Sequence, residues 1–191
     1  AQKAGKVYSV EYNGELVDAS RDFLRNNPNG DRVEVIHADA FDYVPPEPVD
    51  VVICEMLHVG MLREKQLTMI DAFKARYESR FPGRRLPTFI PFASLQAVQP
   101  LSYDYNLEGY YAPIILFQDA YGTDERATPL ADPAASQQLL YENSYDTVCK
   151  FDGSIQITAA GKINALRFIT KSLLVISPDC RSTVHWLNQH L

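Results

Sequence analysis

The sequence predicts an α/β fold followed by a mostly antiparallel β domain. Three observations support this prediction. Apolar strands alternate with amphipathic helices in the first half of the 191-residue chain, helical periodicity fades after Pro87, and short β-rich segments then take its place. We therefore expect two domains, which cover residues 1–86 and 87–191.

Three strands and two helices are predicted in the first half. The strands cover Lys6–Asn13, Val33–Phe41 and Val49–Glu55, and the third is apolar on both faces, as a central parallel strand is. The helices cover Gly14–Asn27 and Glu64–Phe81, where apolar residues recur at intervals of three or four. The order strand, helix, strand, strand, helix predicts an open α/β sheet.

The second half is predicted to be rich in short strands. The candidates are Ser94–Val98, Ala112–Phe117, Thr147–Phe151, Ser154–Thr158, Ala165–Val175 and the residues from His185 onward. The Asp152-Gly153 step between β-forming residues predicts a hairpin turn. Residues 119–141 are rich in Ala, Asp, Pro and Gln, so we expect a loop there with a short helix over Asp132–Tyr141.

The amino-acid composition argues against several classes of protein. Hydrophobic residues make up 46% of the chain and the net charge is −6, which predicts a packed core and argues against nonspecific nucleic-acid binding. Cys54, Cys149 and Cys180 are far apart and show neither zinc nor disulfide spacing. No apolar run reaches the length of a membrane span. We therefore expect a cytoplasmic protein without a membrane or metal partner.

Acidic residues follow the first two predicted strands. Glu11 ends the first strand, where a carboxylate can accept hydrogen bonds from the two hydroxyl groups of a ribose; a solvated strand-end acid is the alternative. Asp39 ends the second, where it can accept from the amino group of adenine while the Ala40 amide donates to a ring nitrogen; a turn-capping Asp is the alternative. Together the two acids indicate a cofactor that contains a nucleoside.

Two further glutamates flank the apolar segment after the third strand. Glu55 ends that strand, and Glu64 lies nine positions later, beyond a loop that contains His58. Two carboxylates brought together by such a loop can bind a planar guanidinium through paired hydrogen bonds. The alternatives are that Glu64 is a first-turn acid favoured by the helix dipole, and that His58 packs against apolar neighbours.

Aromatic residues form two further groups. His185 and Trp186, near the end of the chain, belong either to a site or to a buried or interface pair. The tyrosines of Tyr103–Tyr111 cluster without interleaved Lys and Arg, which favours a packing or interface patch over a base-stacking platform.

These segments resemble the protein arginine methyltransferases, a family of enzymes that depend on S-adenosyl-L-methionine. KVYSVEYN (Lys6–Asn13) resembles the strand with the ribose-binding acid, VEVIHADAF (Val33–Phe41) the segment that contacts adenine, and VDVVICEMLHVGMLREKQ (Val49–Gln66) the strand and double-glutamate loop. STVHWLNQ (Ser182–Gln189) is similar to the threonine-histidine-tryptophan loop that walls the substrate pocket. The resemblance implies a partial Rossmann-like methyltransferase sheet followed by a β-barrel-like domain that is incomplete.

The resemblance also implies roles for individual residues. The residues implied to bind S-adenosyl-L-methionine are Glu11, Asp39, Ala40 and Glu55. Glu55 and Glu64 would hold the acceptor nitrogen and raise its nucleophilicity, and His185 would orient the pocket wall or take part in proton removal. Met56, His58 and Trp186 would line the substrate pocket.

Departures from the family pattern leave more than one function open. The family has Trp, Met, Gly and Tyr after the first glutamate, whereas residues 56–59 here are Met, Leu, His and Val, and Val184 separates Thr183 from His185. We expect a methyltransferase that acts on a guanidinium or another nitrogen of a protein or small-molecule acceptor. The alternatives are a methyltransferase of RNA or a small molecule, and a noncatalytic fragment that serves as a binding or dimerisation module.

The ends of the chain carry a further expectation. The first residue is Ala1, close to a strand, and the family's Gly-rich cofactor loop is absent. We therefore expect a piece of a longer protein, truncated at both ends, which by itself binds the cofactor weakly or not at all. Family members form head-to-tail dimers through an arm that projects from the barrel, so a homodimer is expected, with Tyr103–Tyr111 and the segment 119–141 as candidate arms.

Overall fold

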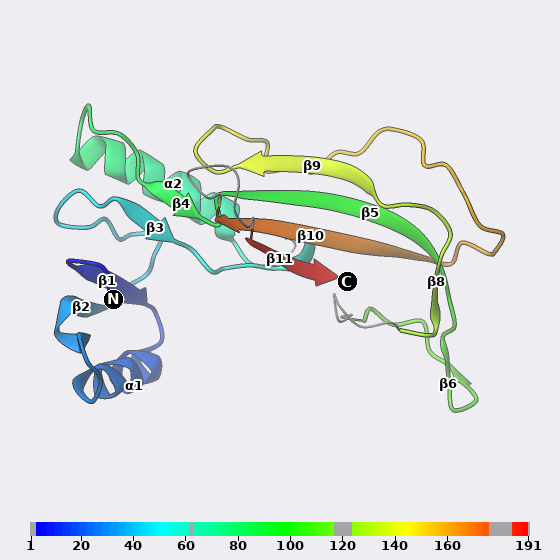
Figure 1. Cartoon of the computed structure of the whole chain (residues 1–191), viewed down its shortest axis with the longest axis horizontal. Coiled ribbons are helices and arrows are strands. Elements are labelled where there is room, and N and C mark those ends of the chain that lie inside the picture. The colour runs from blue at the N-terminus through cyan, green and yellow to red at the C-terminus, as the bar shows by residue number, and fades with distance from the viewer. Residues whose placement is uncertain (1–2, 62, 117–123, 176–184, 191) are drawn as a thin grey trace. The chain divides into compact units, whose positions relative to one another are not determined.

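The chain divides into two compact units. The computed structural model describes residues 3–61, 63–116, 124–175 and 185–190 (Figure 1). One unit contains Ala1–Asp50 and Leu67–Pro87, and the other contains Val51–Gln66 and Thr88–Leu191. Residues 51–66 therefore group with the second unit although they precede it in sequence. The assignment of separate cofactor and substrate domains to residues 1–86 and 87–191 stays a prediction.

A strand–helix–strand motif begins the first unit. Strand β1 (Val7–Glu11) pairs in parallel with β2 (Val33–His37), and Glu11 lies opposite His37 in the register. Helix α1 (Gly14–Arg25) connects the two strands, followed by the 3-10 turn η1 (Gly30–Arg32). The Asn13 side chain caps α1 by accepting a hydrogen bond from the Glu15 amide at 2.9 Å. The predicted elements at these positions are confirmed.

Helix α2 (Gln66–Arg80) supplies most of the remaining core of the first unit. Tyr77 is buried, and its hydroxyl accepts a hydrogen bond from the Val49 amide at 3.2 Å. Arg76 forms an ion pair of 2.8 Å with Asp42. These contacts join the helix to the connector after β2, and they confirm the helix predicted from the spacing of apolar residues.

The prediction that the three strands of the first half share one open sheet is wrong. Strand β3 (Val51–Ile53) pairs in parallel with β4 (Thr88–Ile90) in a separate two-stranded sheet of the second unit, and the described residues show no pairing between β3 and β1 or β2. Hydrophobic pattern predicts that a strand forms, but it does not name the neighbouring strand, because pairing is decided by contacts between distant segments. The partner β4 lies 37 positions along the chain from Val51 to Thr88.

An antiparallel sheet forms the main part of the second unit. Its strands are β5 (Ala93–Tyr103), β8 (Ala127–Pro129), β9 (Ala134–Leu140), β10 (Ala165–Val175) and β11 (His185–His190). The order is β11-β10-β5-β8, and β9 also pairs with β5 (Figure 1). The predicted antiparallel character is confirmed. Among the described strands this order is open, and a closed barrel is not formed.

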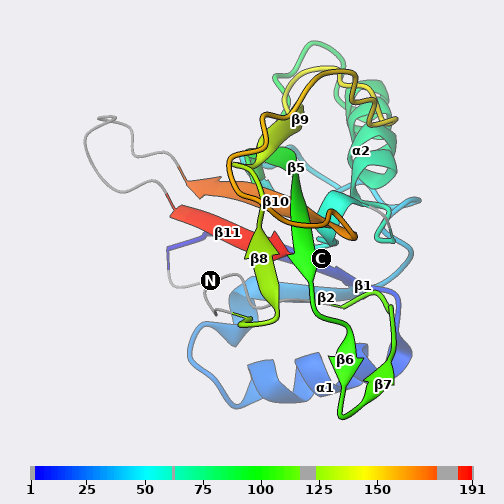
Figure 2. The ribbon, with the colours of Figure 1, turned by 90° about the vertical axis from the view of Figure 1, so that its right-hand side faces the viewer.

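A short hairpin extends the far end of β5. Its strands are β6 (Asn106–Leu107) and β7 (Tyr110–Tyr111), and Figure 2 shows it projecting beyond β5. The turn places Glu108 and Gly109 at positive φ, 51° and 90°, which a glycine adopts without strain. The hairpin presents the tyrosines of its second strand to solvent.

The helix predicted over Asp132–Tyr141 is wrong, because this segment forms β9. Ala134–Leu140 pairs with β5 in an antiparallel register that sets Gln137 opposite Gln96 and Leu140 opposite Ala93. Ala, Gln and Leu favour a helix, but the main-chain hydrogen bonds offered by β5 and the burial of Leu139 outweigh that preference.

Three other predicted strands do not form. Residues 147–151 and 154–158 are irregular and mostly exposed, so the hairpin expected at Asp152-Gly153 is absent from this described stretch. The Thr158 amide instead donates to the Leu130 carbonyl at 2.8 Å. Residues 112–116 form no strand, and Phe117 lies outside the described residues. Among the described residues, none of these segments pairs with a strand.

Candidate functional site

The first two predicted site acids lie at the same edge of one sheet. Since β1 and β2 run in parallel, Glu11 and Asp39 both lie at carboxyl ends. The Glu11 carbonyl accepts a hydrogen bond from the Ala38 amide at 3.1 Å, which continues the ladder by one residue toward Asp39. Ligands of open α/β sheets bind at this edge. The structure thus brings together two of the acids that the sequence singles out.

Local hydrogen bonds hold each acid by one carboxylate oxygen. Oε1 of Glu11 accepts from the Asn13 amide at 2.7 Å, and Oδ1 of Asp39 accepts from the Phe41 amide at 2.8 Å. Asp39 is exposed and Glu11 is half-buried. Within the part of the chain that the structure describes, the second oxygen of each carboxylate accepts no hydrogen bond, so the local bonds orient the acids and leave acceptor capacity at the edge.

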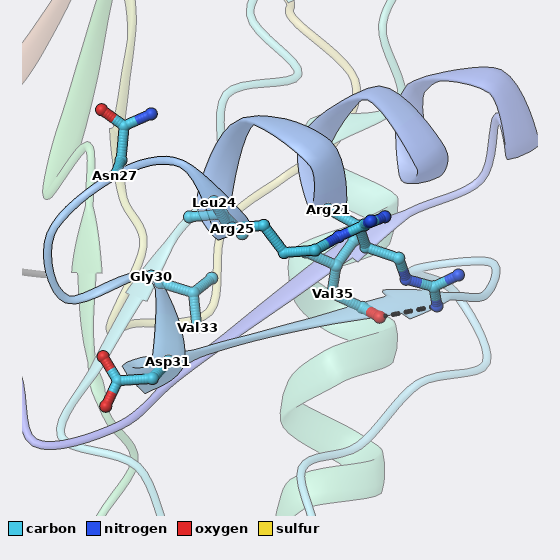
Figure 3. A pocket seen from close by; sticks show the side chains of 8 residues that line it. All are labelled: Arg21, Leu24, Arg25, Asn27, Gly30, Asp31, Val33 and Val35. Carbon is cyan, nitrogen blue, oxygen red and sulfur yellow. Dashed lines mark hydrogen bonds between the residues drawn. The ribbon is translucent and has the colours of Figure 1, made fainter.

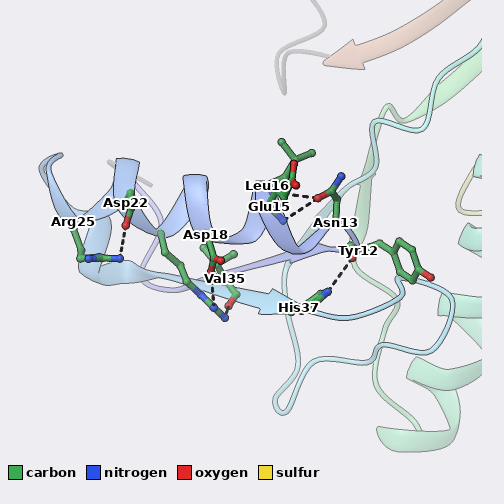
Figure 4. A network of polar contacts seen from close by, with 10 residues as sticks. Tyr12, Asn13, Glu15, Leu16, Asp18, Asp22, Arg25, Val35 and His37 are labelled. Carbon is green, nitrogen blue, oxygen red and sulfur yellow. Dashed lines mark hydrogen bonds and ion pairs between the residues drawn. The ribbon is translucent and has the colours of Figure 1, made fainter.

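His37 is a residue of this edge that the sequence interpretation missed. Its ring Nε2 lies 3.0 Å from the Tyr12 carbonyl, so the side chain reaches across the end of β1 (Figure 4). A Cβ atom on Gly14 would lie 3.4 Å from the His37 ring, so the start of α1 passes close to it. The residue precedes Ala38 and Asp39 directly, but only the strand register shows that it lies opposite Glu11.

A pocket of about 560 Å³ opens elsewhere in the first unit (Figure 3). Its lining comes from the end of α1, η1 and the first part of β2, and it includes none of the predicted site residues. The Arg21 guanidinium crosses it and donates to the Val35 carbonyl at 3.0 Å. Because Val33 and Val35 belong to the beginning and middle of β2, this pocket is separate from the strand-end acids.

Glu55 and Glu64 belong to the second unit, in the segment between β3 and α2. Both side chains are exposed. Cys54, directly before Glu55, is buried, and burial raises the pKa of its thiol to about 11. The segment therefore begins at a buried residue and presents its acids to solvent. That the two carboxylates hold one ligand stays a prediction.

The predicted pocket residues of this segment are half-buried. The Met56 main chain partly offsets the rise in the pKa of the Cys54 thiol that burial causes. Nδ1 of His58 lies 2.8 Å from the Val59 carbonyl, so one ring nitrogen is engaged with the main chain of the same segment. A role of Met56 and His58 in lining a substrate pocket stays a prediction.

His185 and Trp186 lie on β11, beside β10. Their main chains pair with Val175 and Leu173, across a shift in the register. Thr183 and Val184, the residues that precede them in the predicted loop, lie outside the described residues. The roles predicted for His185 and Trp186 stay predictions.

Within the described part of the chain, no group of three or more His, Cys, Asp or Glu side chains could hold a metal ion. Neither helix in these residues is both long enough and apolar enough to cross a bilayer. The cytoplasmic location and the absence of a metal partner stay predictions.

Known proteins resemble part of the sequence. Protein arginine N-methyltransferase PRMT10 of Oryza sativa subsp. japonica is 36% identical over 74 residues, which are 39% of this chain and 19% of the rice protein. An uncharacterized protein of Methanocaldococcus jannaschii is 32% identical over 76 residues, 40% of this chain and 29% of that protein. The matched stretch thus spans about a fifth of the rice relative. No protein family model matches the chain.

Solved structures resemble nearly the whole fold. The Trypanosoma brucei PRMT1 enzyme–prozyme heterotetrameric complex with AdoHcy contains a chain that matches with a TM-score of 0.70 at 14% identity, over 97% of this chain and 61% of that one. Arabidopsis thaliana protein arginine methyltransferase 10 matches with a TM-score of 0.67 at 15% identity, over 98% of this chain and 67% of that one. The chain is therefore arginine methyltransferase-like, in sequence over part of its length and in fold over nearly all of it.

Proposed function

We propose that this chain is part of a methyltransferase that uses S-adenosyl-L-methionine and methylates a guanidinium or another nitrogen. The observation that carries the proposal is the parallel pairing of β1 with β2, which sets Glu11 and Asp39 at one sheet edge in an arginine methyltransferase-like fold. The acceptor would be a protein or a small molecule.

The strand-end residues fit the nucleoside part of this cofactor. The free oxygen of Glu11 can accept from ribose hydroxyl groups, and the free oxygen of Asp39 can accept from an adenine amino group. Among the described residues the Ala40 amide donates no hydrogen bond, so it remains available for a ring nitrogen. When bound, S-adenosyl-L-methionine supplies an electrophilic methyl group. Glu55 is the further residue that we assign to cofactor binding.

Glu55 and Glu64 would bind the acceptor. Two exposed carboxylates can hold a guanidinium by paired hydrogen bonds and draw its positive charge away from the nitrogen that attacks. Met56, His58 and Trp186 would line the acceptor pocket. His185 would orient the wall of that pocket or take part in proton removal.

We also propose that the protein forms a homodimer through the β6–β7 hairpin. Tyr110 and Tyr111 are 78% and 74% exposed, and Ile115, beyond the hairpin, is 81% exposed. Apolar side chains grouped on a projecting element favour an interface. The trypanosomal protein that is similar in fold is part of a heterotetrameric complex, which supports testing whether this protein also self-associates.

Substitution of the two glutamates in the full-length protein tests the proposal. Glu55→Gln and Glu64→Gln keep the shape of each side chain and remove its charge, so methyl transfer is expected to fall by about a hundredfold or more. Glu78→Gln, on the exposed face of α2, is the matched control and is expected to retain activity. The readout is transfer of a labelled methyl group to peptide, RNA and metabolite pools, which also distinguishes the acceptor classes. Unchanged turnover in both variants would rule out the glutamate clamp.

A further inference from the structure

Buried polar side chains hold the middle of the segment from Glu55 to Glu64 against the sheet of the second unit. The Gly60 amide donates to Thr170 Oγ1 at 2.7 Å, and Thr170 Oγ1 donates to Gln96 Oε1 at 2.5 Å. Thr170 is fully buried and Gln96 nearly so. The main chain halfway between Glu55 and Glu64 is therefore tied to β10 and, through Thr170, to β5.

A second set of buried polar groups holds the end of the same segment. Gln66, two residues after Glu64, donates through Nε2 to the Tyr141 hydroxyl at 3.0 Å. The Tyr141 hydroxyl lies 2.8 Å from Ser94 Oγ, which lies 3.0 Å from Ser172 Oγ. All four side chains are at most 2% exposed, so water does not compete for these hydrogen bonds.

The two sets are built on one polar ladder between β5 and β10. Ser94 lies opposite Ser172, and Gln96 lies opposite Thr170, in the antiparallel register. Residues two apart on a strand point to the same face, so these four side chains share one face of the sheet. Hydroxyl and amide groups are costly to bury, and apolar residues at these positions would pack without that cost. Stability alone therefore does not explain why polar side chains occupy these four buried positions.

We propose that Thr170 and Tyr141 are positioning residues that set the place of the Glu55 and Glu64 carboxylates relative to the sheet of the second unit. This inference rests on the proposed function, in which those carboxylates bind the methyl acceptor. Thr170 holds the segment at Gly60, and Tyr141 holds it at Gln66. Because Thr170 lies on β10 and Tyr141 directly follows β9, both in the second unit, the acceptor-binding acids are built on that unit and not on the strand-end edge that carries Glu11.

Amide hydrogen exchange of residues 55–66 tests the two anchors without a measurement of enzyme activity. Thr170→Val keeps the side-chain shape and removes the hydroxyl, so the Gly60 amide is expected to exchange about tenfold faster or more. Thr170→Ser keeps the hydroxyl and is expected to retain most of the protection. Tyr141→Phe is expected to speed exchange around Gln66. Thr128→Val, on exposed β8, and Tyr105→Phe, a half-buried ring at the other end of β5, are matched controls that should leave the segment unchanged.

Steady-state kinetics of the full-length enzyme test what the anchors position. Thr170→Val and Tyr141→Phe are expected to raise the KM for the acceptor and to lower kcat about tenfold, because a displaced carboxylate binds the acceptor in the wrong place. The KM for S-adenosyl-L-methionine should rise less than the KM for the acceptor, since Glu11 and Asp39 are unaffected and only Glu55 among the cofactor residues is displaced. A purely structural role would lower the amount of active enzyme and leave both KM values alone.

The outcomes separate this inference from the proposed function. Unchanged exchange at Gly60 in Thr170→Val and around Gln66 in Tyr141→Phe would overturn the inference, even if Glu55→Gln abolishes methyl transfer. Faster exchange together with full activity of Glu55→Gln and Glu64→Gln would leave the anchors in place and overturn the proposed function. If Thr170→Val does not fold, Tyr141→Phe decides the question, because a ring of the same size remains in the core.

Discussion

Glu11 shows how much of the site depends on the geometry of a single residue. It is the last residue of β1, and the Asn13 amide holds one of its oxygens at 2.7 Å. Asn13 in turn caps α1, so the turn that starts the helix also orients the acid. The same few residues therefore begin the helix and shape the proposed ribose site.

Glu11→Gln in the full-length protein is expected to weaken the affinity for S-adenosyl-L-methionine about tenfold, because the charged acceptor of the ribose hydroxyl groups becomes neutral. Isothermal titration calorimetry measures the change in dissociation constant. Glu15→Gln, an exposed acid in the first turn of α1, is the control and should bind as the unchanged protein does. Equal affinity of all three proteins would remove Glu11 from the cofactor site.

Asp124 connects a single residue to the acid stability of the second unit. Hydrogen bonds from Arg126 and then from the Tyr103 hydroxyl lower the pKa of its carboxyl from 3.8 to about 2. Burial and the bond to Asp124 raise the pKa of Tyr103 to about 12, so the phenol remains a donor at neutral pH. A carboxyl whose pKa is lower in the folded state stabilises the fold above the unfolded value.

Asp124→Asn is therefore expected to destabilise the protein by about 1–2 kcal/mol at pH 7, after allowance for partial exposure. The difference from the unchanged protein should shrink as the pH falls from about 4 to about 2, where the native carboxyl also becomes protonated. Urea unfolding of both proteins across this range measures it. A difference in unfolding free energy between the two proteins that is the same at every pH would show that Asp124 does not stabilise the fold through its charge.

At the scale of elements, the connection from α1 to β2 depends on close main-chain packing. Asn29 has a φ of 62°, and the chain then passes so near the end of α1 that a Cβ on Gly30 would lie 2.0 Å from the Leu24 carbonyl oxygen. Only glycine permits this approach. The turn at Asn29 and Gly30 is thus also a packing contact between η1 and the helix.

Gly30→Ala is expected to lower the free energy of unfolding of the first unit by about 1–3 kcal/mol, because backbone must move to admit the methyl group. Gly5→Ala is the matched control, since a Cβ at Gly5 would meet nothing within 4 Å, and its effect should stay within about 0.5 kcal/mol. Chemical denaturation followed by circular dichroism compares the two. Equal stabilities would mean that the turn relaxes without cost.

Elements with strong periodicity were predictable, and elements that depend on a partner were not. α1 and α2 follow from apolar residues at helical spacing, and β10 follows from a run of β-forming residues. β9 was predicted as a helix, because its Ala and Gln residues favour one locally. In the structure six residues of β9 pair with β5, and no local sequence pattern predicts which strand this segment pairs with.

At the scale of the whole molecule, the β6–β7 hairpin is the surface that bears on assembly. Tyr110→Ser combined with Ile115→Ser is expected to weaken self-association of the full-length protein by tenfold or more, because two large exposed apolar side chains are lost. Sedimentation velocity over a range of concentrations measures the dimer fraction. Ile163→Ser, another exposed apolar position of the second unit, is the control. The same dimer fraction in all three proteins would place the interface elsewhere.

The sequence by itself determined where helices and several strands form, and it placed acids at the ends of strands. These properties depend on residues within a few positions of one another, so local periodicity and capping reveal them. Only the tertiary structure decided that Glu11 lies opposite His37, that β3 pairs with β4, and that Thr170 lies beneath Gly60. Such contacts join residues tens of positions apart, and their free energy arises from burial and pairing that exist only after the chain has folded.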